Sequence, residues 1–185
     1  MMRSILASHA IRLVGLVLIV PAAGILMASY PVPPRELRGR AGASCRSPEP
    51  GPAFRLTVSG LKDREGKLLL ELYPANDKDF LAADKKLIAA GKPFLRVDRA
   101  IPAEGNPVIC IRAPEPGRYA LVVLHDRDGN GKFSYLRDGV AFPGNPSLVR
   151  SKPKAAAASL VAQDGVVTDD VTLQYLRGLR FRPVH

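Results

Sequence analysis

An oxygen-rich loop in the second half of the chain carries the clearest chemical signal in the sequence. Oxygen donors recur at every second position, in the order Asp126, Asp128, Asn130, the carbonyl of Lys132 and the hydroxyl of Ser134. Hard cations such as Ca²⁺ take about six to eight oxygen ligands from flexible loops, and this spacing matches the first part of an EF-hand loop. The loop is therefore a candidate calcium site.

The second part of the EF-hand pattern is missing. The position that needs a bidentate Glu is Arg137, Asp138 follows one residue later, and a strand rather than a helix leads into the loop. We therefore predict a weak calcium site, in the class of extracellular modules, with His125 and Asp138 in supporting positions. The alternative stays open, because Asp-Gly and Asn-Gly also favour hairpin turns, and the loop would then be a plain connection.

The pair His125 and Asp126 raises the question of hydrolytic catalysis. A hydrolase needs a nucleophile, a base oriented by a third group and an oxyanion hole. Neighbours on a strand point to opposite faces, so Asp126 does not orient His125 directly, and Ser134 or Ser147 reaches it only through folding. We predict a protein that is not an enzyme and whose His125 bonds the loop backbone, with a hydrolase centred on His125 as the less favoured alternative.

A rigid element must hold these side chains, and the segment before the loop supplies one. Residues 119–125 form an uninterrupted apolar run after the turn signal Pro116-Gly117. Both alternating faces of the run are apolar until its end, which is typical of a central strand covered on both sides. The loop is therefore predicted to lie at the rim of a sheet.

The remaining patterns predict a mainly β protein. Helical spacing of apolar residues within 76–91 predicts one short helix. Further strand candidates are 54–60, 67–73, 94–101, 108–112, 132–136 and 166–176. About seven short strands with regularly spaced turns predict an antiparallel β-sandwich of immunoglobulin-like or prealbumin-like type.

The same segments resemble an uncharacterised bacterial family, domain of unknown function 2141. The matching motifs are Pro116-Gly117-Arg118-Tyr119-Ala120, His125-Asp126, Gly129-Asn130-Gly131-Lys132-Phe133, the glycine-pattern segment 139–145 and Leu72-Tyr73-Pro74. The likeness covers residues 54–175 and implies a secreted or periplasmic β-sandwich of unestablished function, without catalytic residues to carry over. The chain departs from the family pattern at Ser134, where an acid is more usual.

The beginning of the chain is typical of an export signal. Arg3 and Arg12 precede an apolar stretch over 13–27 that ends among small residues. We predict a signal peptide or membrane anchor over 1–29, a disordered linker rich in Pro, Gly and Arg over 30–52, the sandwich domain over 53–176 and a basic tail over 177–185. The protein would be periplasmic or secreted, or anchored to the inner membrane by residues 13–29.

Two cysteines, Cys45 and Cys110, are present in a chain that is predicted to be exported. Such a pair favours one disulfide, which would stabilise the fold by about 4 kcal/mol in the chain-entropy model. The alternative is two independent thiols, with Cys110 a small core residue.

The formal net charge is +10 over 185 residues. A basic protein of this kind favours an anionic neighbour, such as an envelope polyanion or a membrane surface. The sequence contains no nucleic-acid recognition motif, so nucleic acid is not a predicted partner. Solubility alone is the alternative explanation, because many of the charges lie in the tails.

Overall fold

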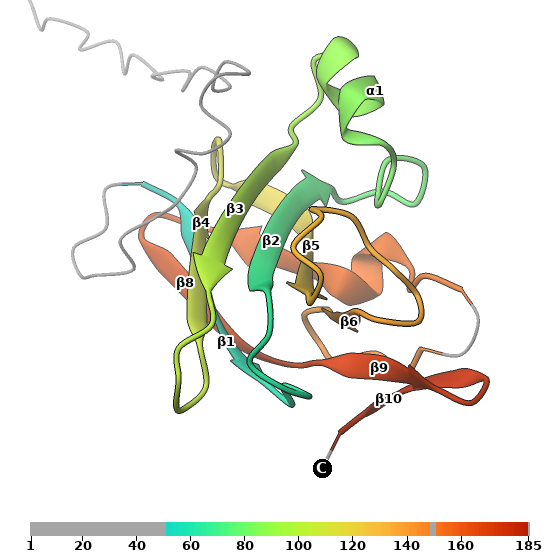
Figure 1. The fold of residues 1–185 in the computed structure, drawn as a ribbon. Coiled ribbons are helices and arrows are strands. Elements are labelled where there is room, and N and C mark those ends of the chain that lie inside the picture. The colour runs from blue at the N-terminus through green and yellow to red at the C-terminus, as the bar shows by residue number, and fades with distance from the viewer. Residues whose placement is uncertain (1–50, 149–150, 185) are drawn as a thin grey trace, which may run out of the picture.

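A computed structural model of the chain describes residues 51–148 and 151–184 and consists mainly of β-strands arranged in two sheets (Figure 1). The predicted signal or anchor over 1–29, the linker over 30–52 up to residue 50, and Cys45 lie outside the described residues. Among the residues described, no helix is long and apolar enough to cross a membrane.

The smaller sheet has three strands in the order β4-β1-β8, with bounds Val108–Arg112, Ala53–Ser59 and Val166–Thr172. In the larger sheet the order is β10-β9-β6-β5-β2-β3, and β7 also pairs with β5. The bounds of these strands are Arg180–Pro183, Gln174–Arg177, Gly139–Ala141, Gly117–Asp126, Lys67–Pro74, Leu95–Ala100 and, for β7, Ser159–Ala162.

The two sheets share one apolar core, which is the basis for describing the fold as a sandwich. Alternating residues of β1, such as Leu56, meet alternating residues of β2 and β5, such as Leu70 and Leu121, in a single buried cluster. Burial of each of these side chains stabilises the fold by roughly 1.5–3 kcal/mol. The prediction of a mainly β fold with two layers is therefore confirmed, with β5 as a central strand between β2 and the pair β6 and β7.

One strand pair departs from the predicted antiparallel arrangement. Strand β1 pairs with β8 in parallel, with Ala53 opposite Val166 and Ser59 opposite Thr172. The chain then passes from the smaller sheet to the larger one at the fully buried Leu173, so the segment predicted as one strand over 166–176 is divided into β8 and β9. Alternation along one strand gives no information on the direction of its partner, which is why the sequence did not indicate the parallel pair.

Three other segments differ from their predicted structures. The helix α1 spans only Asp84–Ala89 and follows a series of turns, and a 3-10 helix occupies Ala155–Ala158. Residues 132–136 form a loop instead of a strand, because the amide of Ser134 bonds a loop carboxylate rather than a neighbouring strand. Most of the segment 177–185, predicted as a tail, belongs to the β9–β10 hairpin, whose inward face carries Phe181.

Candidate functional site

The oxygen-rich loop connects the interior strands β5 and β6 at one end of the larger sheet. Strand β5 ends at Asp126 and β6 begins at Gly139, and the two strands pair antiparallel with His125 opposite Gly139. The loop is thus the connection of a β-hairpin, as the plain-turn alternative requires, and its two ends are held by the ladder. A cation site and a hairpin connection are therefore compatible in this loop.

Three carboxylates of the loop converge. One oxygen from each of Asp126, Asp128 and Asp138 lies within 4.8 Å of the other two. Asp126 and Asp138 are each only 1% exposed, whereas Asp128 is exposed to solvent. Asp138, predicted as a supporting residue, thus stands with the two predicted acids at the centre of the cluster.

The two buried carboxylates are held by backbone amides from the loop itself. The amides of Asn130 and Gly131 donate to Asp126 Oδ1 and Oδ2 at 3.1 and 2.9 Å. The amides of Arg127 and Ser134 donate to Asp138 Oδ1 and Oδ2 at 3.0 and 2.7 Å. A carboxylate has about four lone-pair sites, so each acid keeps acceptor capacity for a cation.

The other predicted ligands form local turns. Asn130 Oδ1 accepts a hydrogen bond from the amide of Lys132 at 2.7 Å, and Asn130 N also lies 3.2 Å from Asp128 Oδ1. Ser134 contributes its amide to the site through Asp138. These bonds fix the path of the loop between its acidic residues.

Of the two arginines next to the cluster, Arg127 is directed elsewhere and Arg137 approaches only the exposed acid. The Arg127 guanidinium pairs with Asp63 at 2.5 Å and with Glu65 at 3.2 Å. Desolvation raises the pKa of the Asp63 carboxyl, but the hydrogen bond and charge of Arg127, together with the backbone bond from Glu65, outweigh it. The net effect is a lowered pKa. Arg137 Nη1 lies 3.7 Å from Asp128 Oδ2, but among the described residues neither of the two buried acids has an ion pair with a cationic side chain.

His125 is fully buried, and both of its ring nitrogens are occupied. Nε2 lies 2.8 Å from the carbonyl oxygen of Glu65, and Nδ1 lies 2.6 Å from the Tyr175 hydroxyl. A carbonyl only accepts, so Nε2 carries the proton, while Tyr175 receives a bond from Lys62 N and donates to Nδ1. Desolvation lowers the pKa of His125 and raises the pKa of Tyr175 to about 12, which keeps both groups neutral.

The position opposite His125 must be a glycine. A Cβ on Gly139 would lie 2.5 Å from the ring of Tyr175, which is closer than real Cβ contacts come. The Tyr175 ring thus lies over the backbone of β6 while its hydroxyl reaches His125. Gly139 is therefore required for the bond that holds the end of β5.

A comparison with protein families gives a match that spans the strands and loop described above. The family described as an uncharacterised protein conserved in bacteria, DUF2141, matches residues 56–169, which is more than half of the chain. The chain belongs to the DUF2141 family. No curated protein and no solved structure matches it.

The DUF2141 match extends from β1 into β8 and includes the whole β5–β6 loop with its three converging acids. The predicted resemblance to this family is therefore confirmed. Cys110 lies buried in β4 within the matched region, but Cys45 precedes the described residues, so the disulfide between them stays a prediction.

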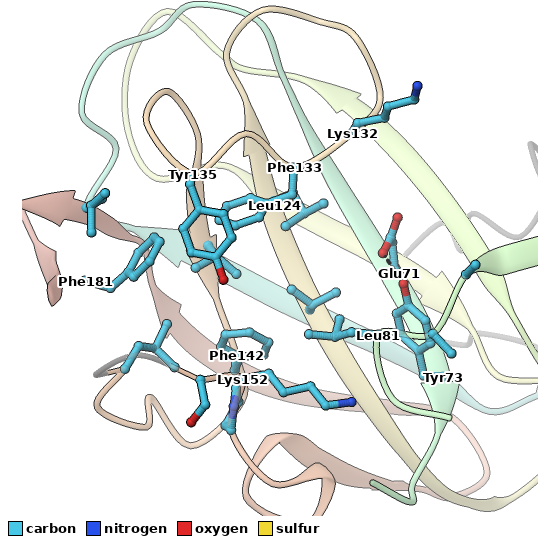
Figure 2. Close-up of a pocket in the computed structure, with 18 of the residues that line it drawn as sticks. Glu71, Tyr73, Leu81, Leu124, Lys132, Phe133, Tyr135, Phe142, Lys152 and Phe181 are labelled. Carbon is cyan, nitrogen blue, oxygen red and sulfur yellow. Dashed lines mark hydrogen bonds between the residues drawn. The ribbon is translucent and has the colours of Figure 1, made fainter. Parts of the chain in front are cut away.

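Sequence reasoning missed a second candidate site, a cavity of about 830 Å³ on the outer face of the larger sheet. Strand β5 contributes Leu124, Phe142 follows directly after β6, and the β5–β6 loop contributes Phe133 and Tyr135 (Figure 2). The available signal was the second apolar face of residues 119–125 together with the aromatic residues directly after the acids. These patterns predict a strand that is covered on both faces, and they give no sign of a cavity.

Proposed function

We propose that this protein is a non-enzymatic, exported β-sandwich module whose β5–β6 loop binds calcium weakly. The observation that carries the proposal is the convergence of carboxylate oxygens from Asp126, Asp128 and Asp138 within 4.8 Å. Like charges at this separation repel, and a divalent cation between them would remove the repulsion. Calcium suits the site because its ligands are oxygens on a loop.

Low affinity follows from the composition of the site. The EF-hand position for a bidentate Glu is occupied by Arg137, whose guanidinium lies 3.7 Å from Asp128 and competes with a cation. The amides that already bond Asp126 and Asp138 also reduce the charge available to a metal. These features support an affinity in the millimolar class of extracellular calcium modules.

The surroundings of His125 support the non-enzymatic part of the proposal. Its ring is buried, and its two nitrogens are used by the Glu65 carbonyl and the Tyr175 hydroxyl. A general base must reach the proton that it abstracts, and no serine hydroxyl bonds this ring among the described residues. The geometry favours His125 as a residue that fixes the beginning of the loop.

Calcium titration of the purified full-length chain tests the loop. We expect a thermal shift and a calorimetric signal at millimolar Ca²⁺, and a weaker response in Asp128→Asn, whose side chain is exposed and whose loss leaves the buried acids in place. Asp164→Asn, at an exposed position in the β7–β8 connection, is the matched control and should respond like the wild type. A wild-type chain that does not respond at millimolar Ca²⁺ contradicts the proposal.

Export is tested separately from ion binding. Expression of the full chain in a bacterium, followed by separation of periplasm, membrane and cytoplasm, should place it outside the cytoplasm. We also expect a disulfide between Cys45 and Cys110 that protects both thiols from alkylation until a reductant is added. Recovery of the chain in the cytoplasm with two reactive thiols would contradict the proposed location.

One further observation favours binding of a polyanion as a second function. Arg177 pairs directly with Arg180 across the β9–β10 hairpin, and Arg182 lies two residues further along on the same face. All three are exposed, and like charges directly opposite each other are destabilising unless an anion lies between them. Retention on heparin that is reduced by Arg180→Gln, and not by the exposed control Arg118→Gln, would support this function.

A further inference from the structure

The cavity on the outer face of the larger sheet has the dimensions of a ligand site. Its volume of about 830 Å³ lies within the range of about 300–1,000 Å³ that is usual for small-molecule pockets. Val122 and Leu124 of β5 and Val140 of β6 form part of its lining, and all three are buried. The cavity is therefore a hollow above a rigid sheet.

The cavity exists because the outer face is covered from two separate directions. The segment before α1, including Leu81, covers the sheet at one end, and the β9–β10 hairpin with Phe181 lies at the other (Figure 1). Phe133, Tyr135 and Phe181 form an aromatic cluster with ring centroids 5.1–6.1 Å apart. Figure 2 shows these rings together on one side of the cavity and Leu81 and Tyr73 on the other.

Exposed apolar side chains gather at this cavity. Of the large hydrophobic residues that the structure exposes, Leu81 at 36%, Tyr135 at 59% and Leu179 at 75% line it. Leu81 also has a φ of 60°, a left-handed conformation that is strained for a bulky residue. Exposed apolar surface and backbone strain in one place are both typical of a binding site.

Charge at the cavity is positive and only partly compensated. Arg96 is neutralised by Glu71 through a 2.5 Å ion pair, and Tyr73 donates to the same carboxylate at 2.6 Å. Lys152 Nζ donates only to the backbone carbonyls of Asp77 and Phe80, and the Asp77 carboxylate pairs with Lys154 instead.

Lys132 and Lys152, two of the three lysines that line the cavity, form no ion pair with an acidic side chain among the described residues. The Lys132 ammonium group has no hydrogen bond or ion pair within the described part of the chain. Two of the three N–H donors of Lys152 are used by carbonyls, so one remains for a ligand. An apolar interior beside uncompensated lysines is complementary to a molecule with a hydrocarbon chain and one anionic group.

We propose that this cavity binds a single-chain anionic amphiphile of the long-chain carboxylate class. The alkyl chain lies along Leu124 and Phe142 and against the ring of Tyr135, and the carboxylate lies at Lys152. Lys132 adds to the positive field at the margin. This proposal does not rest on calcium binding, because none of the loop carboxylates takes part in it, although Lys132, Phe133 and Tyr135 belong to the same loop.

Calorimetric titration of the full-length chain with decanoate tests the proposal, with EDTA present and decanoate below its micellar concentration. We expect saturable binding, and clearly weaker binding of the neutral chain decanol. Lys152→Met keeps most of the apolar stem but removes the charge, and it should weaken decanoate binding by about ten-fold while leaving decanol binding unchanged. Lys86→Met, at an exposed lysine of α1 that does not line the cavity, is the matched control.

The possible outcomes separate the proposal from its competitors. Absence of decanoate binding to the wild type overturns it. Equal binding of decanol and decanoate would show a purely apolar site, and equal losses in Lys152→Met and Lys86→Met would place the anionic group elsewhere; each result also overturns it. Circular dichroism of both variants checks that the fold is retained.

Discussion

The two faces of the larger sheet are built from the same strands and have different consequences. Leu70 and Leu121 point toward the smaller sheet, where they pack in one buried cluster with side chains of β1, β4 and β8. The neighbouring Leu69 and Val122 point outward, where turns, a short helix and Phe181, from the hairpin that continues this sheet, pack against them. The inner face packs against a second sheet, whereas the outer face packs against irregular segments and leaves a cavity.

This difference separates stability from binding within single strands. A sheet packed on a sheet fills its interior by interdigitation, because both surfaces have regular spacing. Loops and hairpins approach a sheet at few points, so they leave space between the points of contact. Residues that alternate along β5 therefore serve the core on one side and the cavity on the other.

The largest predicted effect is a loss of stability when the inner face is truncated. Leu70→Ala removes a fully buried side chain between the two sheets, and we expect a loss of about 2–5 kcal/mol in the free energy of unfolding. Leu81→Ala on the outer face should cost far less, because that side chain is partly exposed and its backbone is strained. Urea unfolding followed by circular dichroism measures both; similar losses would refute the distinction between the faces.

The next effect concerns the contact between Gly139 and Tyr175 at the end of the loop. Gly139→Ala brings a methyl group within 2.5 Å of the Tyr175 ring, and we expect a loss of about 1–3 kcal/mol. The same substitution in a Tyr175→Ala background meets no ring, so most of this loss should disappear. A double-mutant cycle without coupling would show that the ring moves away at little cost.

A third, smaller effect is a dependence of stability on pH. Burial lowers the pKa of His125 below its usual 6.5, so the unfolded chain binds the proton first as the pH falls. Stability contributed by neutral His125 should be complete above pH 6.5 and should fall below it, with a slope of at most about 1.4 kcal/mol per pH unit.

Urea unfolding midpoints across this range measure the slope. His125→Gln should flatten it, whereas His9→Gln, in the predicted signal, should leave it unchanged. Carboxyls with lowered pKa values, such as Asp63, lose their contribution only at lower pH, so the two windows are distinct. A wild-type slope that persists in His125→Gln would assign the effect to another group.

The features that sequence predicted are those encoded within one element. Two apolar faces in 119–125 predicted the central strand β5, and spacing within the loop predicted Asp126 and Asp128 as neighbours in space. Strands β6 and β7 have three and four residues, too few to show alternation. Asp138, predicted in a supporting position at the far end of the same loop, lies beside Asp126. The parallel β1–β8 pair and the cavity depend on how distant segments meet.

The smallest predicted change in stability tests the outer face most directly. Tyr135 is 59% exposed and its ring contacts Phe133 and Phe181, so Tyr135→Ala should change the free energy of unfolding by no more than about 0.5 kcal/mol. It removes one wall of the cavity, so binding of decanoate and of decanol should both weaken by several-fold. Leu136→Ala, at a more exposed position that does not line the cavity, is the control for both measurements. If Tyr135→Ala lowers stability by as much as Leu70→Ala does, the ring belongs to the core, and the outer face is closed in the same way as the inner one.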